Sequence, residues 1–244
     1  MISARDIERW FESAHYRKKC DWVCVDQPKV IREWGKKGLI GQVICSDKIE
    51  KPAWTNTIPC LDVEHAWFNQ VTKKPSHMGM MVIIERPTYK VSELMRAPRV
   101  LLLDGIQDPG NLGTMIRSMV AFGCNALCLT NDCVDPFHPK SVNASCGAIA
   151  HVGIYFETHW MDWIKETKHP IYVLDPQGLS TIWDVERSKN YVLVCGSEGQ
   201  GIQSTLIKSV HINPISIPMA DEMESINAAL SVGIGLHQLS YPIK

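Results

Sequence analysis

The feature that most constrains the fold is a series of short apolar runs after residue 99, separated from one another by polar or helical sequence. Runs of four to six apolar residues are typical of strands that are buried on both faces. When such strands alternate with helices, they predict a parallel sheet covered by helices. We therefore predict an α/β domain over residues 99–244, with strands at 100–103, 126–129, 171–174, 191–195 and 212–217.

A second, smaller domain is predicted over residues 1–90, where aromatic and basic residues mix. Five of the eight tryptophans lie in the first 70 residues, among strand-like runs at 22–25 and 42–45. The run 78–84 predicts a last buried strand, which Arg86 and Pro87 would end. Residues 86–99 contain Pro87, Pro98 and several cationic side chains, and they predict a linker between the two domains.

The formal net charge of −1 hides an asymmetry between the two parts of the chain. Residues 1–98 hold sixteen Lys and Arg against twelve Asp and Glu, a net charge of +4, and residues 99–244 have a net charge of −5. The first part is therefore the better candidate for contact with a polyanion. On charge alone, an ordinary solvated surface explains the asymmetry equally well.

The nine cysteines include no CxxC pair, so we expect no metal site. Several lie within apolar runs, where a free thiol behaves as a small buried hydrophobic group, and we expect them to be reduced. The first ten residues lack the apolar region of a signal peptide, and no stretch approaches the roughly 18 apolar residues of a membrane span. These observations predict a cytoplasmic protein with no membrane partner.

Three polar loops follow strands of the predicted sheet, where the ligand site of an open α/β sheet lies. In the first loop, Asn111 is expected to cap a helix that Gly123 ends, and Arg117 follows Asn111 by about one and a half turns. A helix N-terminus beside an arginine suits a phosphate group. The alternative for this spacing alone is a capped helix with a surface arginine.

The second loop, 194–202, places Glu198 among three glycines, Gly196, Gly199 and Gly201. It matches neither a Walker motif nor GxGxxG, and an ordinary glycine-rich turn is the alternative. In the third loop, 217–227, Ser225 is expected to cap the helix of the apolar stretch 228–239, with Asn227 in its first turn.

Taken together and in order, the three loops resemble the SpoU/TrmH branch of the SPOUT class of RNA methyltransferases. The family motifs read approximately N-x-G-x-x-x-R, G-x-E-x-x-G and I-P-M…S-L-N, and the resemblance covers residues 99–241. The chain departs from the pattern at Ile226, where the family usually has leucine, and at Asp221, where it has glycine. The second departure puts the path of residues 219–224 in doubt.

The resemblance implies a SPOUT methyltransferase domain over residues 99–244, whose last segment forms a deep trefoil knot. Knots of this kind are an exception among protein folds. A weaker similarity over residues 1–90 implies a small α/β domain that binds the RNA substrate. Members of the family are dimers with the site near the knot, so a homodimer is also implied.

The resemblance further implies S-adenosyl-L-methionine as the methyl donor and no metal. It places the donor mainly against the backbone of Leu174, Gly196, Gly201, Ile217 and Ile226. The implied catalytic residues are Asn111, Arg117, Glu198, Ser225 and Asn227. The motif arginine is often taken as the general base, but guanidinium groups stay protonated in proteins. Arg117 could instead stabilise the developing oxyanion or bind the neighbouring phosphate.

The predicted reaction is methylation of a ribose 2′-hydroxyl in a structured RNA, with ribosomal RNA favoured over transfer RNA. Two other classes remain as alternatives. A nucleotide-dependent oxidoreductase or ligase would share the strands and glycine turns but lacks its own fingerprint here. An RNA-binding accessory protein would fit the basic N-terminal part but leaves the three loops unexplained.

Overall fold

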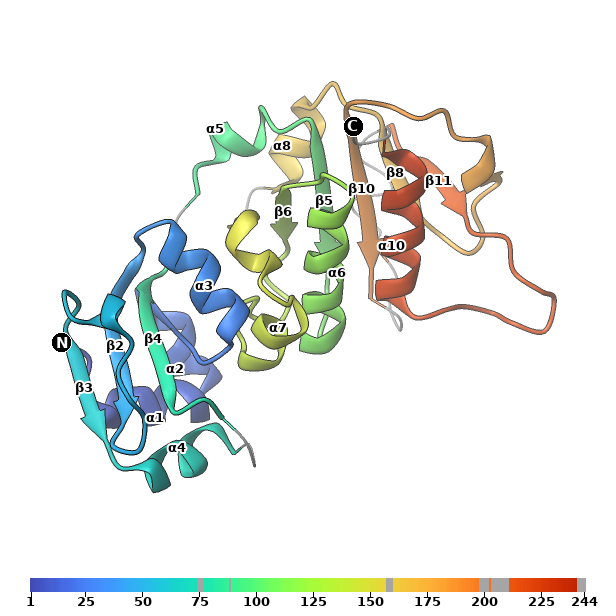
Figure 1. Ribbon diagram of the computed structural model, residues 1–244. Coiled ribbons are helices and arrows are strands. Elements are labelled where there is room, and N and C mark those ends of the chain that lie inside the picture. Colours follow the sequence, from blue (N-terminus) through green and yellow to red (C-terminus); the bar gives the residue numbers. More distant parts are fainter. Residues whose placement is uncertain (74–76, 88, 157–159, 198–201, 203–210, 241–244) are drawn as a thin grey trace.

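The computed structural model describes residues 1–73, 77–87, 89–156, 160–197, 202 and 211–240. It contains two sheets, one from each part of the chain, and the chain runs from the first to the second without returning (Figure 1). The α/β class predicted for both parts is confirmed. The exact boundaries of the two domains stay predictions.

The first sheet has four strands in the order β1 (Trp22–Val25), β4 (Met80–Glu85), β2 (Ile40–Ser46) and β3 (Cys60–Val63). Strand β4 is antiparallel to β1 and β2, whereas β2 and β3 are parallel. The three apolar runs of this region were predicted as strands. Strand β3 was not predicted, because it lies at the edge of the sheet, is only partly buried and contains Asp62.

Four helices pack around this sheet: α1 (Ala4–Glu12), α2 (Ala14–Lys19), α3 (Pro28–Lys36) and α4 (His65–Thr72). A short 3-10 turn, η1 (Ala53–Thr55), precedes β3. The tryptophans of this region supply much of the core, since Trp10 and Trp34 are fully buried and Trp10 stacks on Trp22. A large aromatic core of this kind lets a small domain bury enough apolar area to fold.

The second sheet has seven strands in the order β7-β6-β5-β10-β8-β11-β9, and all neighbouring strands are parallel. Its strands are β5 (Arg99–Asp104), β6 (Ala126–Leu129), β7 (Gly153–Phe156), β8 (Ile171–Leu174), β9 (Ser180–Thr181), β10 (Tyr191–Gly196) and β11 (Asn213–Ser216). The five predicted strands are all present. The two edge strands were missed. Strand β9 has only two residues, and β7, although as long as β6 and β8, begins with glycine and ends on an exposed phenylalanine.

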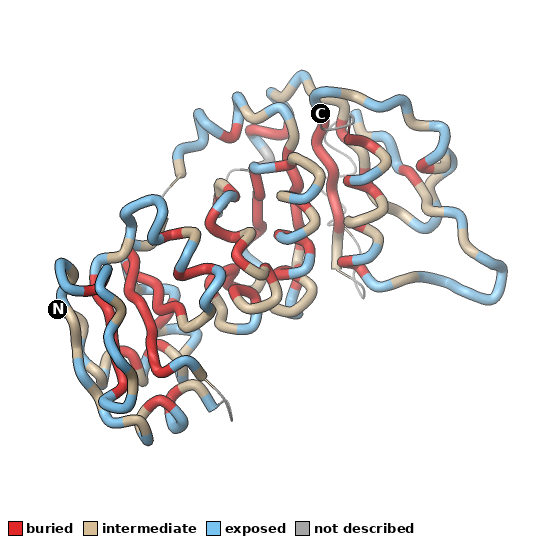
Figure 2. The backbone as a smooth tube through the Cα atoms, in the orientation of Figure 1, coloured by how far each residue is buried: buried red, intermediate tan, exposed pale blue. Residues whose placement is uncertain are grey.

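Helices cover both faces of this sheet. Helices α6 (Pro109–Ala121) and α10 (Ala228–Leu239) lie side by side on one face, with α7 (Pro139–Ala144) and η2 (Ala148–His151) beside them (Figure 1). Helices α5 (Val91–Leu94) and α8 (Trp160–Glu166) contribute to a separate core on the other face. Alternate residues of β5 serve the two cores, and the central strands are the most continuously buried segments (Figure 2).

Residues 86–99 connect the two sheets, and their described side chains pack against both parts of the chain. Arg86 is tied to both parts of the chain, because one guanidinium nitrogen donates to the backbone oxygen of Arg17 and the other to Asp135 at 2.8 Å. Leu94, on α5, is fully buried in a core of the second sheet. The proline and charge content of this segment did not indicate these contacts.

The structure describes all nine cysteines, and all nine are free thiols. Six of them are buried, as predicted, whereas Cys20, Cys60 and Cys146 are partly exposed. No helix within the described residues is long and apolar enough to cross a membrane. Within the same residues, no group of three or more His, Cys, Asp or Glu could hold a metal ion.

Candidate functional site

A cavity of about 360 Å³ opens at the carboxyl ends of three neighbouring strands of the second sheet. Its walls come from the ends of β8 and β10, from the segment after β11 and from the first turns of α10. The lining residues include four that were expected to hold the methyl donor, together with Ser225: Leu174, Gly196, Ile217 and Ile226. Gly201, the fifth expected contact, lies outside the described residues.

The cavity is well suited to bind a ligand through backbone groups. Parallel strands end there with amide and carbonyl groups that no further strand residue can pair. Val173, Cys195 and Ile215 supply an apolar floor. Asp175 is the one ionisable side chain other than cysteine among the described lining residues, and its carboxylate accepts the backbone N–H of Gln177 at 2.9 Å. Sequence reasoning missed Asp175, although its position directly after a predicted strand was a usable signal.

A side-chain hydrogen bond joins two of the predicted catalytic residues. The Nδ2 of Asn227 donates to the Oδ1 of Asn111 at 3.0 Å, across 116 residues of sequence. The Oδ1 of Asn227 also accepts the backbone N–H groups of Ala229 and Leu230. Since its oxygen is used for these two bonds, Asn227 must present its NH₂ group to Asn111. The first turns of α6 and α10 are thereby held together.

Two predicted helix caps are wrong. Helix α6 begins at Pro109 and is capped by Asp108, whose carboxylate accepts the N–H of Asn111 at 2.7 Å. Proline is favoured at the first helical position, so the helix starts three residues earlier than predicted. Helix α10 is capped by Asn227 and not by Ser225. Both asparagines therefore turn toward each other, and the phosphate site predicted from a free α6 N-terminus loses an N–H group to Asp108.

Arg117 lies farther along α6, exposed to solvent, and its Nη1 is 3.6 Å from the Sγ of Cys146. Cys146 has a left-handed backbone with φ of 51°, and Gly147 follows with φ of 96°. Left-handed geometry is costly for a residue other than glycine, and such strain is often found at functional sites. Arg117 is not among the cavity-lining residues. Glu198, the remaining predicted catalytic residue, lies outside the described residues.

Asn227 both caps α10 and bonds Asn111, and two substitutions at this position separate these two functions. Asn227→Ser keeps a good cap but is too short to reach Asn111, whereas Asn227→Ala loses both functions. We expect both variants to lower kcat by about fivefold to tenfold, the value of one hydrogen bond. Only alanine should lower the melting temperature. A serine variant with the wild-type kcat would show that the bridge has no part in the reaction.

Comparison with known proteins places the chain in a family. The model of the SpoU rRNA methylase family matches residues 98–237, more than half of the chain. The chain belongs to this family.

Individual relatives agree with this assignment. The chain is similar to the 23S rRNA (guanosine(2553)-2′-O)-methyltransferase RlmP of Bacillus subtilis, with 26% identity over 91% of this chain and 90% of that protein. It is 31% identical to an uncharacterized tRNA/rRNA methyltransferase of Mycobacterium avium over 75% of this chain, and this match spans 62% of that protein. The crystal structure of the SpoU methyltransferase AviRb from Streptomyces viridochromogenes, in complex with AdoMet, has a TM-score of 0.86 at 20% identity and covers 97% of this chain and 96% of that one. This last likeness shows the fold.

Proposed function

We propose that this protein transfers a methyl group from S-adenosyl-L-methionine to a ribose 2′-hydroxyl of RNA. The observation that carries the proposal is the position of the cavity. It lies at the carboxyl ends of β8, β10 and β11, and residues of the second and third family motifs line it. The first motif is connected to it through Asn111, which is bonded to Asn227 at the start of α10. The family match and the RNA 2′-O-methyltransferase among the relatives support the proposal.

The cavity fits the proposed methyl donor. Its volume falls in the range usual for small-ligand sites, about 300 to 1,000 Å³. Apolar side chains can enclose the adenine ring, and strand-end backbone groups can bind its edge. Leu174, Gly196, Ile217 and Ile226 would hold the donor, with Gly201 from the adjoining loop. The donor supplies an electrophilic methyl group, and Asp175 provides a negative charge in the cavity of the kind that suits a cationic ligand.

The residues of this chain would position the acceptor and stabilise charge. The 2′-hydroxyl is a poor acid, so its approach must be in line and its developing oxyanion needs a fixed positive group. We assign that role to the guanidinium of Arg117, with Asn111, Ser225 and Asn227 holding the ribose or the loop. Glu198 is assigned to orient Arg117 or Asn111.

Ribosomal RNA is the proposed substrate, with transfer RNA as the second candidate. RlmP, which is similar over nine tenths of both chains, is named for its action on 23S rRNA. The net positive charge of residues 1–98 supports a role in RNA binding for the N-terminal part, which we propose as the substrate-binding domain over residues 1–90. Residues 99–244 would then form the methyltransferase domain.

We also propose that the chain is knotted and dimeric. Strand β11 lies beyond β8 in the sheet, yet α10, which follows it, returns to pack on β10 and α6, as a threaded C-terminal segment would. Helix α10 carries no Asp, Glu, Lys or Arg and leaves Leu230 exposed. A helix that is apolar on nearly all sides is normally buried, so a second copy would cover its free face. Light scattering during size-exclusion chromatography should give the mass of a dimer.

Calorimetry and methyl transfer together test the proposed function. S-adenosyl-L-methionine should bind the full chain, and NAD and ATP should not. Labelled methyl groups should then pass to protein-free 23S rRNA, and mass mapping of the product should place them on a ribose. Tight binding of NAD or ATP would instead support the oxidoreductase or ligase class. Binding of RNA with no affinity for S-adenosyl-L-methionine would support an accessory protein.

A further inference from the structure

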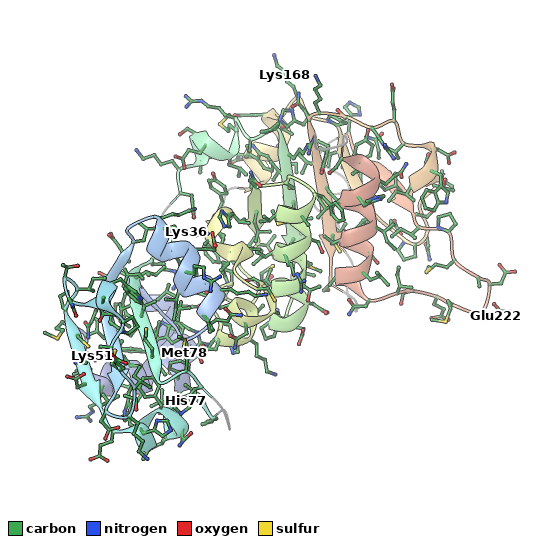
Figure 3. The ribbon with its side chains drawn as sticks, in the orientation of Figure 1. Lys36, Lys51, His77, Met78, Lys168 and Glu222 are labelled. Carbon is green, nitrogen blue, oxygen red and sulfur yellow. The ribbon has the colours of Figure 1, made fainter. Side chains whose placement is uncertain are left out.

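A second cavity, of about 620 Å³, lies in the N-terminal part of the chain and has no role in the reaction described above. It lies between α3, the start of β2, the segment around η1 and the start of β4. Its walls are mostly apolar and include Ile31, Trp54, Ile58 and Met78, together with Arg32. Figure 3 labels Met78 and also Lys36 at the end of α3.

An exposed aromatic ring lies at this cavity, on a turn whose next residue is buried and hydrogen-bonded. Trp54 is 44% exposed and Met78 is 39% exposed, although other tryptophans of this region are buried in the core. The next residue, Thr55, is buried, and both its N–H and its hydroxyl donate to the carbonyl oxygen of Pro52, at 2.9 and 2.8 Å. The two hydrogen bonds of buried Thr55 therefore hold the backbone of the 3-10 turn, while the indole of Trp54 lies at the surface. An exposed indole is suited to stack on a flat ligand.

The charge around the cavity favours an anionic ligand. Arg32 is the only ionisable side chain among the described lining residues, and no described carboxylate lines the cavity. Of the neighbouring lysines, Lys36 pairs with Glu33 and Lys37 donates to the backbone oxygen of Ala150, so Arg32 is the cation that lines the cavity. The combination of an aromatic face with an arginine is one that binds unstacked nucleobases and their phosphates.

A series of contacts connects this cavity to Arg117. Lys29, which follows the lining residue Pro28, packs against the backbone of Gly147, where an added Cβ would lie 3.5 Å from it. Gly147 follows Cys146, whose sulfur is 3.6 Å from the Arg117 guanidinium. The two sites are therefore joined through only a few residues across the boundary between the two sheets.

We propose that this cavity binds an unpaired base of the RNA substrate, stacked on Trp54, with Arg32 at a neighbouring phosphate. The inference rests on the proposed function and names how the N-terminal part recognises its RNA. An unpaired base is required because bases in an A-form duplex are stacked and their faces are covered. The cavity would thus select a loop, bulge or open end close to the methylated ribose.

The test compares Trp54→Ala, Trp54→Phe and Arg32→Ala in the full chain, with Trp183→Ala as the matched control. Trp183 is also an exposed tryptophan, but it lies on η3 (Ile182–Asp184) beside the second sheet. Steady-state kinetics with protein-free 23S rRNA should show KM for RNA raised at least about fivefold in Trp54→Ala, the loss expected for one stacked base. Phenylalanine should recover most of this loss, and Arg32→Ala should raise KM in the same direction.

The outcomes distinguish this inference from the proposed function. Affinity for S-adenosyl-L-methionine and kcat at saturating RNA should stay near wild type in all four variants, and Trp183→Ala should leave KM unchanged. Unchanged KM values in Trp54→Ala and Arg32→Ala, with an active wild-type enzyme, would overturn the base-binding site and favour a protein ligand for the cavity. A wild-type protein that neither binds the donor nor methylates RNA would instead overturn the proposed function.

Discussion

Replacing Arg117 by alanine is expected to lower the single-turnover rate of methyl transfer at least about a hundredfold. Removing one fixed group that stabilises a developing oxyanion costs about 10²- to 10³-fold in other enzymes. Arg117 is solvent-exposed, and its one described side-chain contact is with the sulfur of Cys146, so the protein should stay folded without it. Chemistry must be measured with saturating RNA and donor, because slow product release would hide the effect.

A lysine at position 117 separates the two roles proposed for this residue. Lysine keeps the charge but loses the planar fork, so an electrostatic role predicts a reduced rate with the wild-type pH dependence. If the residue were the general base, an amine would lose its proton more readily, and the rising limb of the pH–rate profile would move to lower pH. A profile displaced in this way would overturn the electrostatic role. Arg187→Ala is the matched control, since this exposed arginine precedes β10, away from the strand ends that form the cavity.

The second large effect is expected at Asp135, which joins the two parts of the chain. Its carboxylate is 4% exposed and pairs with Arg86 at 2.8 Å and with Arg17 at 3.6 Å, and Arg17 is itself only 3% exposed. Burial, together with the charge of Arg86, lowers the pKa of Arg17, and Asp135 opposes this shift. The carboxylate of Asp135 therefore balances the positive charges of both Arg17 and Arg86.

Asp135→Asn keeps the shape of the side chain and removes its charge. Breaking a buried ion pair by removing one partner costs about 3 to 5 kcal/mol. For a chain of this length, we expect the melting temperature to fall by roughly 10 °C, measured by differential scanning calorimetry. Affinity for S-adenosyl-L-methionine should change little at lower temperature, because the cavity lies at β8, β10 and β11, and Asp135 follows β6.

Glu33→Gln provides the matched control. Glu33 also pairs across the boundary, with His151 at 3.2 Å, and it bonds Lys36 on its own helix. Lys36 and His151 are exposed and Glu33 is partly exposed, so solvent screens these pairs and the melting temperature should stay close to that of the wild type. An Asp135→Asn variant as stable as Glu33→Gln would show that the buried cluster does not hold the two parts together.

The arrangement of the chain into two α/β parts could be predicted because it depends on local patterns. Continuous apolar runs identified the central strands, which are buried on both faces. The same method missed β3, β7 and β9, at sheet edges where little apolar area is buried and the pattern is weak. It predicted a linker over residues 86–99 but not the partners of Arg86 and Leu94, which a local pattern cannot show.

For the candidate site, the sequence by itself determined which segments take part. The order of the three motifs indicated the family, and strand ends followed by polar loops indicated where a ligand would bind. Only the tertiary structure decided how the residues meet. Asp108 caps α6 and Asn227 caps α10, so the two motif asparagines bond to each other instead of each serving its own helix.

In the N-terminal part, too, the sequence determined some features and the tertiary structure decided others. Its composition showed many tryptophans and an excess of positive charge, but not that Trp10 and Trp34 form the core while Trp54 stays at the surface. The sequence also gave no sign that Asp135 would pair with two arginines far from it in the chain. Local propensity selects strands and helices from neighbouring residues, whereas burial and pairing depend on which surfaces come together when those elements pack.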